Sequence, residues 1–214
     1  MEVIQSVELI RGKRKITFFS GWTVWLKQSD IPSFPLTEGT EVERNSFEKF
    51  IQIHQYPNAL DRAVKCLAER PRSRKEIECR LNAAHFDASV TELVLYKLEM
   101  ENLLDDREFA EQWALSRSRK YGASRIRSEL KNKGIDPETI EAAMNNCSED
   151  DQMDRAEAFA MKKISSMHDS CDPHRMKQRI LSSLVRRGYS WDIAAKAYRK
   201  AIEKNQEYKS GSSV

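Results

Sequence analysis

A helix-ending pattern occurs three times in this chain, and it constrains the fold more than any other feature. Each copy has two apolar residues four positions apart, then a helix-ending residue, an apolar residue and a helix-capping residue. The copies are Ile77-Leu81-His85-Phe86-Asp87, Ile126-Leu130-Gly134-Ile135-Asp136 and Ile180-Leu184-Gly188-Tyr189-Ser190. The sequence therefore predicts three similar corners between helices.

The residues at each corner suit this geometry. Gly134 and Gly188 can adopt the left-handed backbone conformation in which many helices end. His85 adopts it less easily, which predicts a weaker helix end in the first copy. The aspartate or serine that closes each copy can accept hydrogen bonds from the first N–H groups of the next helix.

Another helix is expected before each corner, because apolar residues recur there at helical spacing. The chain then contains three three-helix repeats with a period of roughly 50 residues. One such repeat covers its apolar face poorly alone, whereas stacked neighbours bury it. We predict a mainly α fold with repeat 1 at residues 58–104, repeat 2 at 105–147 and repeat 3 at 148–205.

The N-terminal region, residues 1–57, has a different pattern. The stretches “VIQSVELI”, “KRKITFFS” and “TVWLK” are short and rich in β-branched and aromatic residues, which predicts a small β-meander of three strands. After a loop marked by Pro32, Pro35 and Gly39, a helix containing Phe47 and Ile51 is expected to cover one face of the meander. Residues 206–214 are predicted to be a disordered tail.

Composition limits the partners and the compartment. The net charge is only +3, so a basic surface must come from local segregation of charge. Cys66, Cys79, Cys147 and Cys171 form no CxxC pair and are interpreted as reduced thiols. The sequence shows neither a signal peptide nor an apolar run long enough for a membrane helix. We therefore expect a cytoplasmic protein that does not contact membranes. We also expect it to be a monomer.

Basic residues gather at similar places in all three repeats. Three interpretations of these clusters remain open. They could be a solvated helix face, a helix-turn-helix that enters a major groove, or a basic stripe that binds acidic protein or phosphate. The candidate binding residues are Arg72, Arg74 and Lys75 in repeat 1, Arg117, Arg119, Lys120, Arg125, Arg127, Lys131 and Lys133 in repeat 2, and Arg175, Lys177, Arg179, Arg186 and Arg187 in repeat 3.

Other motifs carry less information. His168-x-x-Cys171-x-x-His174 could be part of a metal site, but it lacks a second pair of ligands, so no metal is expected. The aromatic residues of the meander could stack on bases or simply seal the sheet. Trp113 and Trp191 are expected to anchor cores or interfaces. The common catalytic motifs are missing, so neither an enzyme nor a cofactor is predicted.

Four segments resemble the RecX family of recombinase-regulatory proteins. They are “LAERPRSRKEIECRL”, “ENLLDDREFAEQWALSRSRK”, “YGASRIRSELKNKGID” and “LVRRGYSWDIAAKAYRKA”. The resemblance covers residues 60–201, and residues 1–56 resemble an extension found in longer members. The chain departs from the family pattern at His85, where glycine is usual, and at the polar link “SEDDQMDR”.

The resemblance implies three tandem three-helix repeats in an elongated bent rod. It also implies binding to RecA in the groove of its filament on single-stranded DNA, with inhibition of ATP hydrolysis, strand exchange and co-protease action. RecA is thus the expected partner, and single-stranded DNA is a second candidate. The competing hypothesis is a helical protein that binds DNA directly, without RecA.

Overall fold

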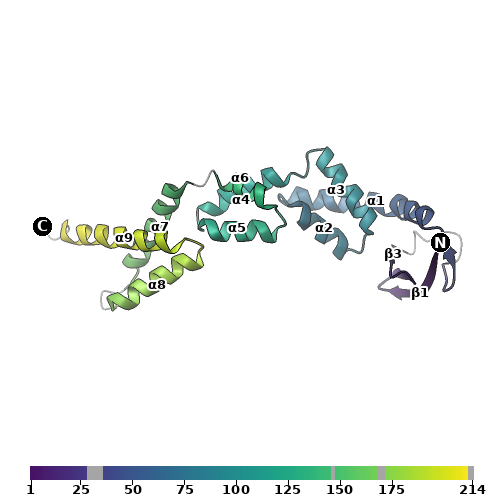
Figure 1. Cartoon of the computed structure of the whole chain (residues 1–214), viewed down its shortest axis with the longest axis horizontal. Coiled ribbons are helices and arrows are strands. Elements are labelled where there is room, and N and C mark those ends of the chain that lie inside the picture. Colours follow the sequence, from purple (N-terminus) through teal and green to yellow (C-terminus); the bar gives the residue numbers. More distant parts are fainter. Residues whose placement is uncertain (28–35, 146–147, 168–171, 212–214) are drawn as a thin grey trace. The chain divides into compact units, whose positions relative to one another are not determined.

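The computed structural model describes residues 1–27, 36–145, 148–167 and 172–211, and Figure 1 shows the order of the elements. The chain divides into two compact units, Met1–Asp105 and Asp106–Val214. The first unit holds the sheet and repeat 1, and the second holds repeats 2 and 3. Within the described residues, no helix is both long and apolar enough to span a membrane.

The N-terminal sheet is antiparallel and has the strand order β3-β2-β1-β4. Its strands are β1 (Glu2–Ile10), β2 (Lys13–Phe18), β3 (Thr23–Lys27) and β4 (Glu41–Val42). The predicted meander is confirmed, and its first turn places Arg11 and Gly12 at φ values of 51° and 76°, as a tight two-residue hairpin requires. The short strand β4 was not predicted; it pairs with the start of β1.

One long helix, α1 (Arg44–Glu69), joins the sheet to repeat 1. The predicted boundary between residues 57 and 58 lies inside this helix, which continues through Pro57. The proline is tolerated because it lies on the exposed side, where water can reach the Ile53 carbonyl that loses its N–H donor. Phe47 and Ile51 are buried, in agreement with the helix predicted to cover the sheet.

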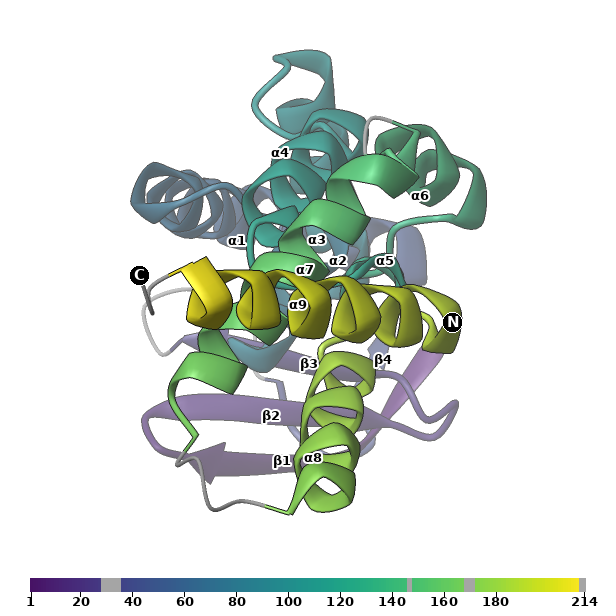
Figure 2. The same ribbon diagram turned by 90° about the vertical axis from the view of Figure 1, so that its left-hand side faces the viewer.

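Eight further helices follow in the described residues. They are α2 (Arg74–Ala83), α3 (Ala88–Met100), α4 (Asp106–Ser118), α5 (Ala123–Asn132), α6 (Pro137–Met144), α7 (Glu149–Ser165), α8 (Pro173–Arg186) and α9 (Trp191–Gly211). In repeat 3, α9 lies across α7 and beside α8 (Figure 2). The helix α9 includes residues 206–211, which were predicted to be a disordered tail; the lysines and glutamates before them favour helix.

The three predicted corners are confirmed in detail. Leu81, Leu130 and Leu184 are each fully buried. At every corner the apolar residue after the turn donates its N–H to the carbonyl of this leucine, from Phe86, Ile135 and Tyr189, each at 3.2 Å. The turn residues His85, Gly134 and Gly188 have φ values of 65°, 82° and 89°, so histidine adopts the same left-handed conformation as the glycines.

A contact with the sheet supports the unfavourable backbone of His85. Its ring stacks on Trp25 of β3, with 4.1 Å between the ring centroids and 18° between the planes. Close by, the buried Gln55 side chain donates to the Trp25 carbonyl and accepts from the Asp87 N–H, both at 2.8 Å. The first corner is therefore fastened to the sheet, and a single core cluster contains residues of both.

We expect the Trp25–His85 pair to be energetically coupled. In a double-mutant cycle of Trp25→Ala and His85→Gly, the coupling should be about 0.5–1.5 kcal/mol, because the stacking is lost in either single variant. His85→Gly should stabilise the protein in the Trp25→Ala background, where only the strained φ is relieved. Urea unfolding of the four proteins measures the cycle. Strictly additive changes would show that the stack does not support the corner.

Repeats 2 and 3 have separate cores within the second unit. The core of repeat 2 contains Phe109, Ile126 and Leu130. In repeat 3 the contact of α7 with α9 is lined by alanines such as Ala160 and Ala197, which allow close helix packing. Trp191 was expected to anchor a core or an interface; 63% of it is exposed, so it does not belong to the core of repeat 3.

Candidate binding surface

The candidate cations of repeat 1 are largely engaged in holding its helices together. The Arg72 side chain is only 6% exposed and forms an ion pair with Glu69 at 3.0 Å. Arg74 of α2 contacts two carboxylates of α3, Glu92 at 2.7 Å and Glu99 at 2.8 Å. Lys75 is exposed. Of the three predicted residues, Lys75 is thus the one whose charge faces solvent most fully.

In repeat 2, cations and aromatic rings alternate along α4 and α5. The Arg117 guanidinium lies 4.7 Å from the Trp113 ring centroid, and the Arg125 guanidinium lies 4.0 Å from that of Tyr121. The Lys133 ammonium lies 4.1 Å from the Trp113 ring on α4. Each contact is attractive because a cation meets the electron-rich face of the ring. The Lys133 contact joins the end of α5 to α4, whereas the Arg117 contact lies within α4 and the Arg125 contact reaches the turn between the two helices.

One carboxylate neutralises the centre of this arrangement. Glu129 accepts hydrogen bonds from Arg117 at 2.9 Å, Arg125 at 3.1 Å and the Trp113 indole N–H at 3.1 Å. The acid that stands alone in a basic stretch of sequence is thus the common partner of its neighbours. Sequence spacing predicts the Arg125–Glu129 contact, but not the contacts that α4 supplies.

Arg127 also has a counterion. It forms a bidentate pair with Glu141 of α6, with N–O distances of 2.8 and 2.9 Å. Hydrogen bonding from Arg127 lowers the pKa of the Glu141 carboxyl, so the pair stays charged. Arg119, Lys120 and Lys131 are exposed. Much of the positive charge that the sequence suggests in repeat 2 is therefore neutralised within the repeat.

Repeat 3 differs because α8 carries no carboxylate at all. Arg175, Lys177, Arg179 and Arg186 are exposed, and within the described residues no ion pair joins them to an acid. Arg187, which follows the helix, is engaged instead. Its guanidinium lies 4.0 Å from the Phe159 ring centroid and donates to the Lys120 carbonyl at 3.1 Å. Among the helices of the second unit, α8 is thus the one whose cations have no acid on the same helix.

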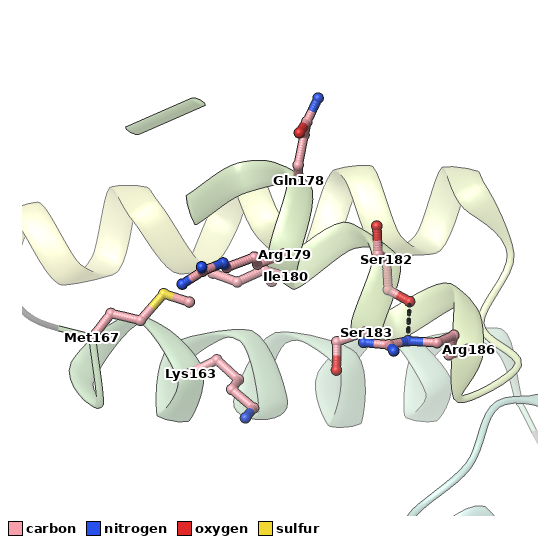
Figure 3. Close-up of a pocket in the computed structure, with 8 residues that line it drawn as sticks. All are labelled: Lys163, Met167, Gln178, Arg179, Ile180, Ser182, Ser183 and Arg186. Carbon is pink, nitrogen blue, oxygen red and sulfur yellow. Dashed lines mark hydrogen bonds between the residues drawn. The ribbon is translucent and has the colours of Figure 1, made fainter. Parts of the chain in front are cut away.

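A groove runs between the end of α7 and one side of α8, with a volume of ≈ 560 Å³. Figure 3 shows Arg179 reaching toward Met167, with Lys163 on the facing helix and Arg186 farther along α8. The residues that line it are Lys163, Met167, Gln178, Arg179, Ile180, Ser182, Ser183 and Arg186. All are cationic or neutral. Lys163 was not among the predicted residues.

Repeats 2 and 3 meet at the first turn of α5. This helix has no side-chain cap at Gly122. Its first N–H groups instead find acceptors in repeat 3: Gly122 donates to the Arg187 carbonyl at 2.9 Å, and Ser124 to the Gly188 carbonyl at 3.2 Å. The backbones approach so closely that a Cβ on Gly122 would lie 2.4 Å from backbone atoms of Gly188. Sequence reasoning missed this contact, since its two sides are far apart in the chain.

The remaining candidate motifs are only partly described. His168 and Cys171 lie outside the described residues, His174 is exposed, and the described residues contain no cluster of metal ligands. In the sheet, Phe18 is fully buried and stacks on Trp22 with 4.9 Å between centroids. This agrees with a sealing role and leaves Phe18 unavailable for stacking on bases.

Comparisons with known proteins agree on one family. The models of the second and third three-helix domains of RecX match residues 105–144 and 149–207. The regulatory protein RecX of Corynebacterium efficiens is 34% identical over 171 residues, covering 75% of this chain and 79% of that protein. The regulatory protein RecX of Chlorobaculum tepidum is 34% identical over 137 residues, covering 63% and 82%.

Solved structures show the same fold. The crystal structure of a regulatory protein RecX matches 92% of this chain and 98% of its own, with a TM-score of 0.63 and 21% identity. The crystal structure of RecX from Lactobacillus salivarius matches 69% and 97%, with a TM-score of 0.63 and 22% identity. Together with relatives above 30% identity that align over most of their length, these matches place the chain in the RecX family of regulatory proteins.

Proposed function

We propose that this protein binds RecA, and RecA filaments on single-stranded DNA, and thereby inhibits recombinase, ATPase and co-protease activities. The observation that carries the proposal is the alignment with proteins named as RecX regulatory proteins over most of their length. Inhibition of RecA is what the family resemblance implies. The protein would act in the cytoplasm as a monomeric regulator of DNA repair and recombination.

The proposal describes a binding protein and not an enzyme. The relatives are named as regulatory proteins. The charged surfaces of this chain suit association better than chemistry, because exposed cations steer an acidic partner and fix its orientation. Lys75 in repeat 1, Lys131 in repeat 2 and Arg179 in repeat 3 are exposed examples. Acidic RecA surface and filament phosphate are both suitable partners for them.

A charge reversal in repeat 2 tests the proposal. In the double variant Arg119→Glu and Lys131→Glu, the inhibition of RecA-driven ATP hydrolysis on single-stranded DNA should weaken roughly tenfold or more, because like charges across an interface cost several kcal/mol. Folding should shift by only about 0.5 kcal/mol per exposed site. Inhibition curves at two salt concentrations, together with a melting curve, measure both effects.

The matched control changes the same charge on α9, where Arg199 and Lys200 are exposed. The variant Arg199→Glu with Lys200→Glu should inhibit as well as the parent. If the repeat 2 variant also inhibits as well as the parent at both salt concentrations, its cations form a solvated face. If the parent neither inhibits RecA nor is retained by it in a pull-down with single-stranded DNA, the proposed function is wrong.

Direct binding to DNA without RecA is the second candidate function. The uncompensated cations of α8 favour it, because phosphate neutralisation supplies most non-specific affinity for nucleic acid. A salt titration distinguishes the two functions. Tight binding to bare DNA that falls steeply with salt supports the second, whereas affinity that appears only with the RecA filament supports the first.

A further inference from the structure

We propose that the groove between α7 and α8 binds the phosphodiester backbone of a single nucleic-acid strand. This inference deepens the proposed function, because the bound strand would be the single-stranded DNA inside the RecA filament. Only that location of the strand rests on the proposed function. The groove is the place where the second unit combines a hollow surface with cations that form no ion pair within the described residues.

The cations form a row along α8. Arg175, Arg179 and Arg186 are spaced by four and seven residues, so they lie on one side of the helix. Arg179 and Arg186 line the groove, and Arg175 continues the row one turn before it. The row is about 16 Å long, at 1.5 Å per residue. A nucleic-acid strand carries one negative charge per nucleotide, so successive phosphates can neutralise successive cations along α8. A compact anion could contact only one part of the row.

The groups inside the groove suit phosphate chemically. The planar guanidinium groups of Arg179 and Arg186 can each donate two parallel hydrogen bonds to phosphate oxygens. Lys163, on the facing helix α7, adds a point charge to the opposite wall. The hydroxyl of Ser183 is a further donor of a kind that often contacts the DNA backbone.

The remaining surface predicts binding without sequence preference. Met167 and Ile180 are the apolar side chains of the lining, and they can contact a sugar or a base edge without reading it. Gln178, which could read a base edge, points away from the other labelled side chains in Figure 3. Oligothymidylate and a mixed-sequence strand of equal length should therefore bind with similar affinity.

The contrast with repeat 2 supports this assignment. There two arginines meet carboxylates of their own repeat, Arg125 at Glu129 and Arg127 at Glu141. An incoming phosphate would have to compete with those ion pairs. At α8 no such competition occurs within the described residues, so the full attraction is available to an anionic strand.

The test is fluorescence anisotropy of the full-length protein with a labelled oligothymidylate of about 16 nucleotides. The variant Arg179→Gln with Arg186→Gln should bind roughly tenfold more weakly, and the slope of log K against log salt should fall by about 1.4, or 0.7 for each lost phosphate contact. Arg175→Gln with Arg179→Gln, which keeps Arg186 and its bond to the Ser182 carbonyl, should give a similar loss.

The control variant Arg199→Gln with Lys200→Gln removes the same charge from α9 of the same repeat and should bind like the parent. Equal losses in control and groove variants would mean that only net charge matters, and would overturn the site. Inorganic phosphate at matched ionic strength should displace the strand poorly. Complete displacement would assign the groove to a free anion and also overturn the proposal.

Assays of RecA inhibition distinguish a failure of this inference from a failure of the proposed function. If the parent inhibits RecA but does not bind the oligonucleotide, while the groove variants lose inhibition, the groove meets acidic protein and the phosphate assignment is wrong. If the oligonucleotide is bound through the groove while RecA is not inhibited, the inference stands and the proposed function fails.

Discussion

Replacing Gly188 with alanine is expected to lower the free energy of unfolding by about 2–5 kcal/mol, the sum of a backbone penalty and an overpacking penalty. The backbone penalty arises because Gly188 has a φ of 89°, where a Cβ meets the neighbouring carbonyl. The overpacking penalty arises because that Cβ would lie 2.4 Å from the Cβ of Arg125 and 2.5 Å from its backbone nitrogen. Relief requires repeats 2 and 3 to move apart.

Two further variants separate these penalties. Gly122 has an ordinary φ of −78°, so Gly122→Ala meets only the clash and should cost about 1–3 kcal/mol. Gly12 has a φ of 76° and nothing within 4 Å of its would-be Cβ, so Gly12→Ala should show only the backbone penalty, about 1–2 kcal/mol. Urea unfolding measures all three variants.

Hydrogen exchange gives a local measure of the same junction. The Ser124 N–H is bonded to the Gly188 carbonyl, so it should exchange faster in Gly122→Ala and in Gly188→Ala. It should not change in Gly12→Ala. Stabilities of Gly122→Ala and the parent that agree within error, with unchanged exchange at Ser124, would contradict the close contact between the repeats.

Leu130→Ala is expected to destabilise the protein by about 2–5 kcal/mol, because it removes buried apolar atoms and leaves a cavity. Leu130 is fully buried in the core of repeat 2, and its carbonyl accepts the Ile135 N–H that closes the corner. Leu81→Ala and Leu184→Ala should have effects of similar size, since these residues occupy the equivalent positions.

Leu115 provides the matched control. It is a leucine of the same repeat, but 69% of it is exposed, so Leu115→Ala should change stability by less than about 0.5 kcal/mol. Thermal and urea unfolding compare the two variants. Equal effects of Leu115→Ala and Leu130→Ala, or rapid amide exchange at Leu130, would contradict the structure of the corner.

The sequence predicted the corners well because their determinants are local. The spacing from Leu130 to Gly134 and on to Asp136 contains a buried position, a left-handed turn and a helix cap within a few residues. The strand β4 was missed because it has two residues and pairs with the distant start of β1. The continuation of α1 through Pro57 was missed because it depends on which side of the helix faces solvent.

The candidate surface was predictable in composition but not in electrostatics. The sequence identifies Arg117, Arg127 and Arg179 equally well as basic residues. In the structure, Arg117 meets Glu129 and Arg127 meets Glu141, through contacts that join different helices. Such pairings depend on tertiary packing, so a count of charges along the chain cannot show which of them remain available to a partner.

The core that β1–β3 share with repeat 1 limits how the chain can be rearranged. In many repeat proteins, whole repeats can be deleted, duplicated or exchanged, because each contacts only its neighbours. Repeat 1 is no such module: Ile16 and Phe18 of the sheet belong to the same core cluster as Leu81 and Leu98. A shuffled array must therefore keep Met1–Asp105 together and vary only the repeats that follow.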